Sequence, residues 1–237
     1  EIDNTLFDTR GNIVDQTIEL YVGGILSRVT LIHNSNISNR GDAGNQEITS
    51  LITDESGSNP IEVSYQLITN RVFDSDSNVL NQLVLNYLDS TRTLLLDVQE
   101  IRNESFDTRG NVLVQKIATF TDETLTTLLD VKLIHNEDID SLGNAGKVTI
   151  WKYAEGYIDA SGYIQYSNLI DATVITTTSF DLRGNALIQT IRKYTDEALT
   201  TLVETQNITT SGYDFHDRAT HSSITTYNST GEFVDRQ

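Results

Sequence analysis

The sequence predicts an all-β protein, built as a tandem array of β-hairpins that form one continuous antiparallel sheet. Three observations support this prediction. The hexapeptide Phe-Asp-Thr-Arg-Gly-Asn occurs at 7–12 and 106–111, and Phe-Asp-Leu-Arg-Gly-Asn occurs at 180–185. The segments between these copies are rich in Val, Ile, Thr and aromatic residues, which favour strands. The pair Gly23-Gly24 separates two such segments and is typical of a two-residue hairpin turn.

Weaker copies of the hexapeptide fill the intervals between the clear ones. They begin at Ile37, Phe73, Ile139 and Tyr213, so seven units start near residues 7, 37, 73, 106, 139, 180 and 213. The spacing, roughly 33 residues, is typical of stacked repeat arrays. We therefore interpret residues 1–237 as a single array of about seven β-hairpin repeats. We expect a solenoid-like sheet, or one shaped as a ribbon or tube.

The hexapeptide is interpreted as the turn that joins one hairpin to the next. Its aspartate can accept a backbone hydrogen bond, and its glycine can take the left-handed conformation that closes a type I turn. A phosphate loop or a receptor ligand is the alternative interpretation of the Arg-Gly-Asn segment. The residues assigned to the turn are Asp8, Arg10, Gly11, Asp107, Arg109, Gly110, Asp181, Arg183 and Gly184.

Two positions in each unit are predicted to form the repeat core. The residue eleven places after each unit start is Ile or Val in all seven units, and the residue fourteen places after it is aromatic in six of seven. The predicted core residues are Ile18, Tyr21, Ile48, Val84, Tyr87, Ile117, Phe120, Ile150, Tyr153, Ile191, Tyr194, Ile224 and Tyr227. Glutamine stands nine places after the start in five units, beginning with Gln16.

A helical repeat is the main alternative fold. Its period would be similar, and residues 195–206 fit a capped amphipathic helix with Leu199, Leu202 and Val203 on one face. The matching segment of the first unit contains Gly23-Gly24 in place of the longer Thr-Asp-Glu insert. Because a Gly-Gly pair between strand-forming runs favours a hairpin, we expect a hairpin in every unit.

The two ends of the sequence match an internal segment when they are written one after the other. Residues 233–237 followed by 1–8 are in register with residues 95–107. We expect the array to be one period of a longer polypeptide, or a subunit whose split strand is completed by the next copy. In either case the main partner is the protein itself.

Composition excludes several classes of partner and site. The net charge is −18, which repels nucleic acid and anionic membrane surfaces. No apolar run approaches the length of a membrane span, so we expect no membrane insertion. The absence of cysteine excludes disulfides, zinc–thiolate sites and thiol catalysis.

The charges are expected to divide between the two edges of the sheet. Arginines lie at or near the turns between hairpins, and acidic residues lie at the opposite hairpin tips. We expect one basic and one acidic edge, through which neighbouring ribbons or successive turns of a wound ribbon pack. The residues concerned are Arg10, Arg40, Arg109, Arg183 and Arg218, and Asp54, Glu55, Asp89, Asp122, Glu123, Glu155, Asp196 and Glu197.

No set of residues predicts catalysis, and no cofactor is expected apart from a weak calcium candidate. Asp74, Asp76 and Asn78 resemble the first half of a calcium-binding loop, although Val79 stands where the loop requires glycine. His33 and His135 occupy equivalent positions and are interpreted as strand-end residues.

The turn signature resembles that of the YD-repeat (Rhs-like) family of bacterial secreted and surface proteins. Phe7-Asp8 with Gly11-Asn12 carries the resemblance most clearly, together with the copies at 106–111 and 180–185, and more loosely Ile139-Asp140 and Tyr213-Asp214. The resemblance implies long β-hairpin ribbons, which in some members form hollow shells around toxins and in others extend from the cell surface.

The sequence favours a structural function. We expect a component of an extracellular or cell-surface filament, stalk or sheath, and not an enzyme. The alternative is an adhesin or carbohydrate-binding module, because Trp151, Tyr157 and Tyr163 lie in or beside an aromatic-rich insert. A third hypothesis is a polysaccharide lyase or glycosidase on a β-solenoid.

Overall fold

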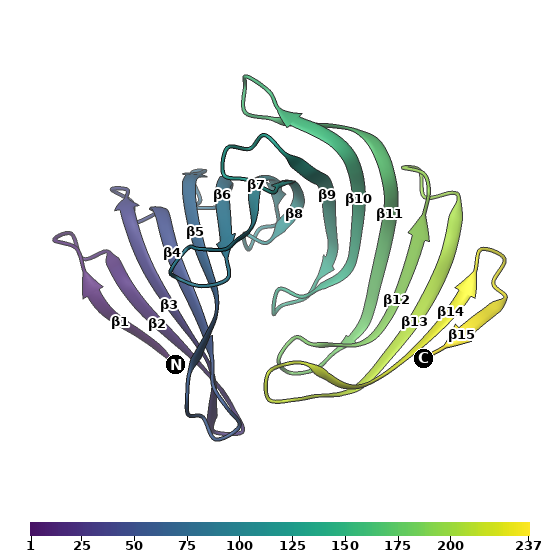
Figure 1. Cartoon of the computed structure of the whole chain (residues 1–237), viewed down its shortest axis with the longest axis horizontal. Helices are drawn as coiled ribbons and strands as arrows, with labels where there is room; N and C mark the ends of the chain where they lie inside the picture. Colours follow the sequence, from purple (N-terminus) through teal and green to yellow (C-terminus); the bar gives the residue numbers. More distant parts are fainter. The chain divides into compact units, whose positions relative to one another are not determined.

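The computed structural model describes all residues, 1–237, and every regular element is a β-strand. Fifteen strands form one antiparallel sheet, in which each strand pairs with its neighbours in the sequence (Figure 1). The predicted all-β class is confirmed. Residues 195–201, the start of the helical alternative, connect two strands without forming a helix.

The strands divide between two compact units. One unit comprises residues 1–102 and 119–129, and the other comprises residues 103–118 and 130–237. The strands are β1 (Ile2–Phe7), β2 (Ile13–Val22), β3 (Ile25–Ile37), β4 (Ala43–Ile52), β5 (Ile61–Phe73), β6 (Val79–Tyr87), β7 (Leu95–Phe106), β8 (Val112–Phe120), β9 (Leu128–Ile139), β10 (Ala145–Ile158), β11 (Ile164–Phe180), β12 (Ala186–Tyr194), β13 (Leu202–Tyr213), β14 (Ala219–Asn228) and β15 (Phe233–Arg236).

The core of the first unit lies on β5, β6 and β7. Val98 is fully buried, and Tyr65 and Tyr87 are cross-strand partners whose ring centroids lie 6.2 Å apart. Each tyrosine also donates its hydroxyl to a carboxylate, Tyr65 to Glu47 at 2.5 Å and Tyr87 to Glu123 at 2.7 Å. Burial and the Glu123 hydrogen bond raise the pKa of Tyr87 to about 12. These rings therefore stabilise the sheet through apolar contact while their polar ends remain satisfied.

The core of the second unit is completed by the longest hairpin, β10–β11, which projects beyond the ends of β12 and β13 (Figure 1). Val131 is fully buried, and Ile164 near the hairpin tip is 2% exposed. A Cβ atom at Gly156 would lie 2.5 Å from Val131 Cγ2, so only glycine fits at this contact. Near the tip, the ring centroid of Tyr166 lies 4.4 Å from the ring centroid of Tyr153.

The predicted core positions differ in burial. Tyr21 is 45% exposed, so its prediction as a core residue is wrong. Tyr21 lies two residues beyond Glu19, the last residue of β2 that bonds to the N-terminal strand, and its hydroxyl donates to the Glu19 carboxylate at 2.7 Å. Val84, Tyr87, Phe120 and Tyr153 are buried, whereas Ile18, Ile48, Ile117, Ile150, Ile191, Tyr194, Ile224 and Tyr227 are half-buried.

The first hairpin has the two-residue connection that its sequence suggests. Gly23 and Gly24 join β2 to β3 with φ values of 61° and 83°, the positive angles of a type I′ turn.

The structure contains no helix with the length and hydrophobicity that a membrane crossing requires.

Candidate functional site

The turns between hairpins share one hydrogen-bonding pattern, which centres on the aspartate side chain. The Asp8 carboxylate accepts hydrogen bonds from the backbone N–H groups of Arg10 at 2.8 Å and Asn12 at 2.9 Å. Asn12 Nδ2 donates to the other carboxylate oxygen at 2.9 Å. Gly11 has a φ of 85° and donates its N–H to the Asp8 carbonyl at 3.0 Å. The Asp8 carboxylate therefore accepts from two backbone N–H groups and one side-chain amide of the turn, which have no partner in a neighbouring strand.

The same pattern recurs along the chain. Asp107 and Asp181 accept the corresponding bonds in the other two hexapeptides, and Gly110 and Gly184 again have positive φ values, of 84° and 86°. At Ser77 and Asp217 a non-glycine residue takes this left-handed conformation. Further side chains that accept from the second and fourth following N–H groups are those of Ser38, Asp54, Asp74, Asp122, Asp140, Asp159, Asp214 and Asn228.

The turn arginines connect successive turns on one edge of the sheet. Arg10 donates to the backbone carbonyls of Ile37 at 2.8 Å and Ser38 at 3.2 Å, which belong to the next turn of that edge. Arg109 repeats this contact with the carbonyls of Ile139 at 3.0 Å and Asp140 at 2.6 Å. Arg40 donates likewise to the carbonyls of Asp74 and Ser75, and Arg183 to that of Asp214.

The prediction of a basic edge is wrong, because these guanidinium groups are neutralised within the edge. Each arginine pairs with an aspartate of its own or the next turn, and its remaining donors reach carbonyl oxygens. The pairs are Arg10–Asp8 at 3.0 Å, Arg40–Asp42 at 2.9 Å, Arg109–Asp107 at 3.2 Å, Arg183–Asp217 at 2.7 Å and Arg218–Asp214 at 2.7 Å. The arginines therefore hold successive turns of the array together.

The recurring glutamines form a second set of contacts between strands. Gln16 Nε2 donates to Asn4 Oδ1 at 2.8 Å, and Gln46 Nε2 donates to Asn34 Oδ1 at 2.8 Å. Asn34 in turn donates to the carbonyl of Ile13, so β2, β3 and β4 are joined by one chain of amides. Gln115 with Asn103 and Gln189 with Thr177 repeat the contact at the same sequence separation.

The residues of the calcium candidate form a turn of the common type. One oxygen of Asp74 accepts from the N–H groups of Asp76 and Asn78, and the other accepts from Asn78 Nδ2 at 2.9 Å. Both oxygens of Asp74 are therefore engaged by the turn itself. No group of three or more His, Asp or Glu side chains is arranged to hold a metal ion.

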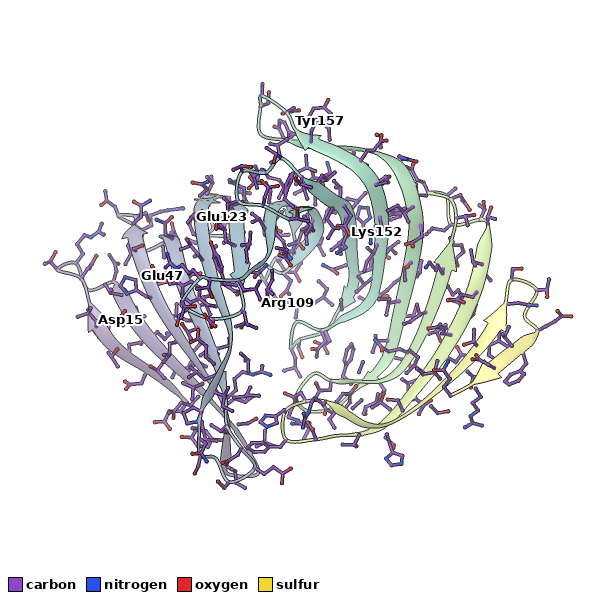
Figure 2. The ribbon with its side chains drawn as sticks, in the orientation of Figure 1. Asp15, Glu47, Arg109, Glu123, Lys152 and Tyr157 are labelled. Atoms are coloured by element: carbon purple, nitrogen blue, oxygen red, sulfur yellow. The ribbon has the colours of Figure 1, made fainter.

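A polar row crosses the first unit at Asp15, His33 and Glu47, which are direct cross-strand neighbours on β2, β3 and β4. His33 Nδ1 lies 2.6 Å from Asp15 Oδ1, and the row lines a recess of about 350 Å³. Figure 2 labels Asp15 and Glu47, the two acids of the row. Sequence reasoning missed this row. Counting outward from the Gly23-Gly24 turn places Asp15 opposite Ile32, and only the irregularity between Leu20 and Tyr21 shifts the register by one residue and brings His33 opposite Asp15. The row contains an oriented imidazole but no nucleophile bonded to it.

The aromatic residues of the proposed glycan platform lie in different environments. Trp151 already has partners within the protein. Its indole N–H donates to the Glu197 carbonyl at 3.0 Å, and its ring centroid lies 4.9 Å from that of His135. Tyr157 and Tyr163 are 63% and 62% exposed. Tyr157 lies near the tip of the β10–β11 hairpin (Figure 2) and lines a recess of about 460 Å³ with Glu155, Gly156, Gln165, Tyr166 and Ser167.

Comparison with known proteins gives no relative: no family model matches the chain, and no curated protein sequence is significantly similar to it.

The turn carboxylates predict a loss of stability in acid. Hydrogen bonds from Asn111 and neighbouring N–H groups lower the pKa of Asp107 to about 2, and those from Thr200 and Thr201 do the same for Asp196. Since these native pKa values lie below the unfolded value of about 4, the stabilisation is complete above about pH 4 and is lost as the pH falls through about 2. We expect the urea midpoint to fall steadily between pH 5 and pH 2, and a constant midpoint would contradict this. In Asp107→Asn we expect a smaller fall in the urea midpoint over the same pH range, because the contribution of the Asp107 carboxylate is absent.

The contact between turns predicts the effect of removing one guanidinium group. In Arg109→Gln the carbonyls of Ile139 and Asp140 lose their donor, and we expect about 1 kcal/mol of destabilisation because the site is partly exposed. Urea unfolding followed by circular dichroism measures this change. Arg192→Gln removes an exposed arginine of the same unit and is the matched control. Equal midpoints for the two variants would show that the contact contributes nothing.

Proposed function

We propose that this protein is a structural component of an extracellular or cell-surface filament, stalk or sheath, built as an array of about seven hairpins of roughly 33 residues each. The observation that carries this proposal is the turn contact, in which Arg10, Arg40, Arg109 and Arg183 each bind backbone carbonyls about 30 residues further along the chain. Each of these arginines thereby holds the turn of one hairpin against the turn of the next. The resemblance to YD-repeat (Rhs-like) proteins supports the same function.

A nearest-neighbour array suits a mechanical role for a physical reason. Each strand pairs only with its neighbours in the sequence, so the stability of an array is close to a sum over hairpins and their interfaces. Length can then increase without a larger core. The net charge of −18 keeps such an assembly hydrated and opposes aggregation of its apolar surface. The partner we propose is a further copy of the same sheet.

Pulling on single molecules tests the array directly. We expect force–extension curves of the full chain to show several successive events, each releasing one hairpin of about 110 Å of chain. A single all-or-none event would contradict nearest-neighbour stability.

Labelling of intact source cells with an antibody against the chain tests the location, and we expect label along surface filaments or a sheath. Label confined to the cell interior would overturn the filament proposal.

A carbohydrate-binding surface is the second candidate function, and the Tyr157 recess favours it. An exposed ring beside a carboxylate and an amide offers one apolar face and several hydrogen-bonding groups, which together suit a sugar. Glu155 accepts from Ser167 Oγ at 3.1 Å, and Gln165 donates to Asp159 at 2.8 Å, so the polar groups of this hairpin tip are already oriented.

Substitution of Tyr157 tests this second function. We expect Tyr157→Ala to abolish retention of the chain on an array of immobilised neutral glycans, because the apolar face of the recess is lost. Tyr21→Ala, which removes an exposed tyrosine of the first unit, should leave retention unchanged. Equal retention of both variants, or no retention of the unaltered chain, would reject carbohydrate binding at this recess.

A further inference from the structure

A second recess lies in the first unit, beside the turns that join β1 to β2 and β3 to β4 and beside the end of β5. Its volume is about 420 Å³. Side-chain amides form most of its polar lining, and one arginine, Arg71, and one aromatic ring, Phe73, complete it. The amides belong to Asn12, Gln16, Asn34 and Gln46.

Arg71 differs from the turn arginines because no carboxylate pairs with it. Its Nη1 donates to the Ala43 carbonyl at 3.0 Å, and its Cζ lies 4.9 Å from the centroid of the Phe73 ring. Its Nε is buried and has no hydrogen-bond partner. Burial lowers the pKa of this guanidinium. The adjacent acid, Asp42, is held by Arg40 at 2.9 Å. The Asp42 charge acts on Arg71 only from a distance, without a salt bridge between the two side chains. A half-buried guanidinium without a directly bonded carboxylate is unfavourable, so an anion that entered the recess would gain a charge-assisted bond.

The amides around Arg71 are only partly used within the chain. The amide groups of Gln16 and Gln46 donate to Asn4 and Asn34, but the Oε1 atom of each glutamine accepts no hydrogen bond from the protein. These carbonyl oxygens can accept from hydroxyl groups, and the second N–H of each amide can donate to them. The recess therefore offers one cation and several neutral hydrogen-bonding groups.

We propose that this recess binds the carboxylate of an acidic sugar, with the uronic acid residue of a polysaccharide as the ligand. The Arg71 guanidinium takes the carboxylate, and the Gln16 and Gln46 amides take the sugar hydroxyls. The planar fork of arginine matches a carboxylate in two parallel hydrogen bonds. The amide lining favours a hydroxyl-rich molecule over a simple organic acid.

The sequence itself shows that the array does not require this arginine. Aligning the segment Phe73–Asn78 with Phe180–Asn185 places Thr178 at the position of Arg71. Both residues fall at a β-bulge that precedes the turn, between Thr69 and Val72 in β5 and between Thr177 and Ser179 in β11. The bulge thus forms without a cation, and the function assigned to Arg71 goes beyond the structural function proposed above.

Calorimetric titration of the full chain with trigalacturonate tests the proposal. We expect saturable binding of this probe, and no binding of its neutral counterpart galactotriose. Arg71→Gln should weaken binding at least about tenfold, the effect of losing a charge-assisted pair. Arg28→Gln removes an exposed arginine of the same unit outside the recess, and should bind as the unaltered chain does. Inorganic sulfate and acetate are titrated as well, to distinguish a sugar acid from a simple anion.

Three results would overturn the proposal: no binding of trigalacturonate to the unaltered chain, equal loss in both glutamine variants, or equally tight binding of sulfate or acetate. Arg71→Lys keeps the charge without the fork and provides a check if Arg71→Gln unfolds. We expect its affinity to lie between those of the unaltered chain and the glutamine variant, and full affinity would contradict paired hydrogen bonds. Stepwise unfolding under force does not depend on this ligand, so the failure of one proposal leaves the other standing.

Discussion

The structure depends first on the side chain that opens the turn, which in most turns is an aspartate carboxylate. In an antiparallel sheet whose neighbouring strands are joined only by short turns, the turn decides which residues face each other, and a slip of one residue would reverse the faces of a whole strand. The Asp8 carboxylate prevents such a slip because it binds the N–H groups of Arg10 and Asn12 together. The same arrangement at Asp107 and Asp181 sets the register of later hairpins.

Contacts between hairpins build on turns that are already fixed. An arginine reaches the next turn of its edge only because both turns have the same geometry, as with Arg109 and the carbonyl of Asp140. The amide pairs add a second connection inside the sheet, where Gln46 and Asn34 are direct cross-strand partners. Since both kinds of contact recur from hairpin to hairpin, the chain gains stability by repetition and needs few deeply buried residues.

The candidate binding surfaces lie where a hairpin departs from the common pattern. The β10–β11 hairpin is longer than the others, and its tip exposes Tyr157 while Gly156 packs on Val131. In the first unit, Arg71 occupies a bulge position that holds Thr178 in the matching hairpin. The Tyr157 ring is exposed and Arg71 is absent from the matching hairpin, so neither side chain belongs to the contacts that recur along the sheet, whereas the regular turns have a structural function.

The sequence by itself determined the β class, the turn chemistry and the Gly23-Gly24 connection, because each depends on residues close together in the chain. It also marked Gln16 and Gln46, although not their partners twelve residues earlier. Only the tertiary structure decided that Tyr21 is exposed, that Arg10 binds the turn at Ser38, and that the buried Arg71 Nε has no hydrogen-bond partner. These outcomes depend on how far each strand extends and on contacts between turns about 30 residues apart in the chain, which form only once the strands between them have paired.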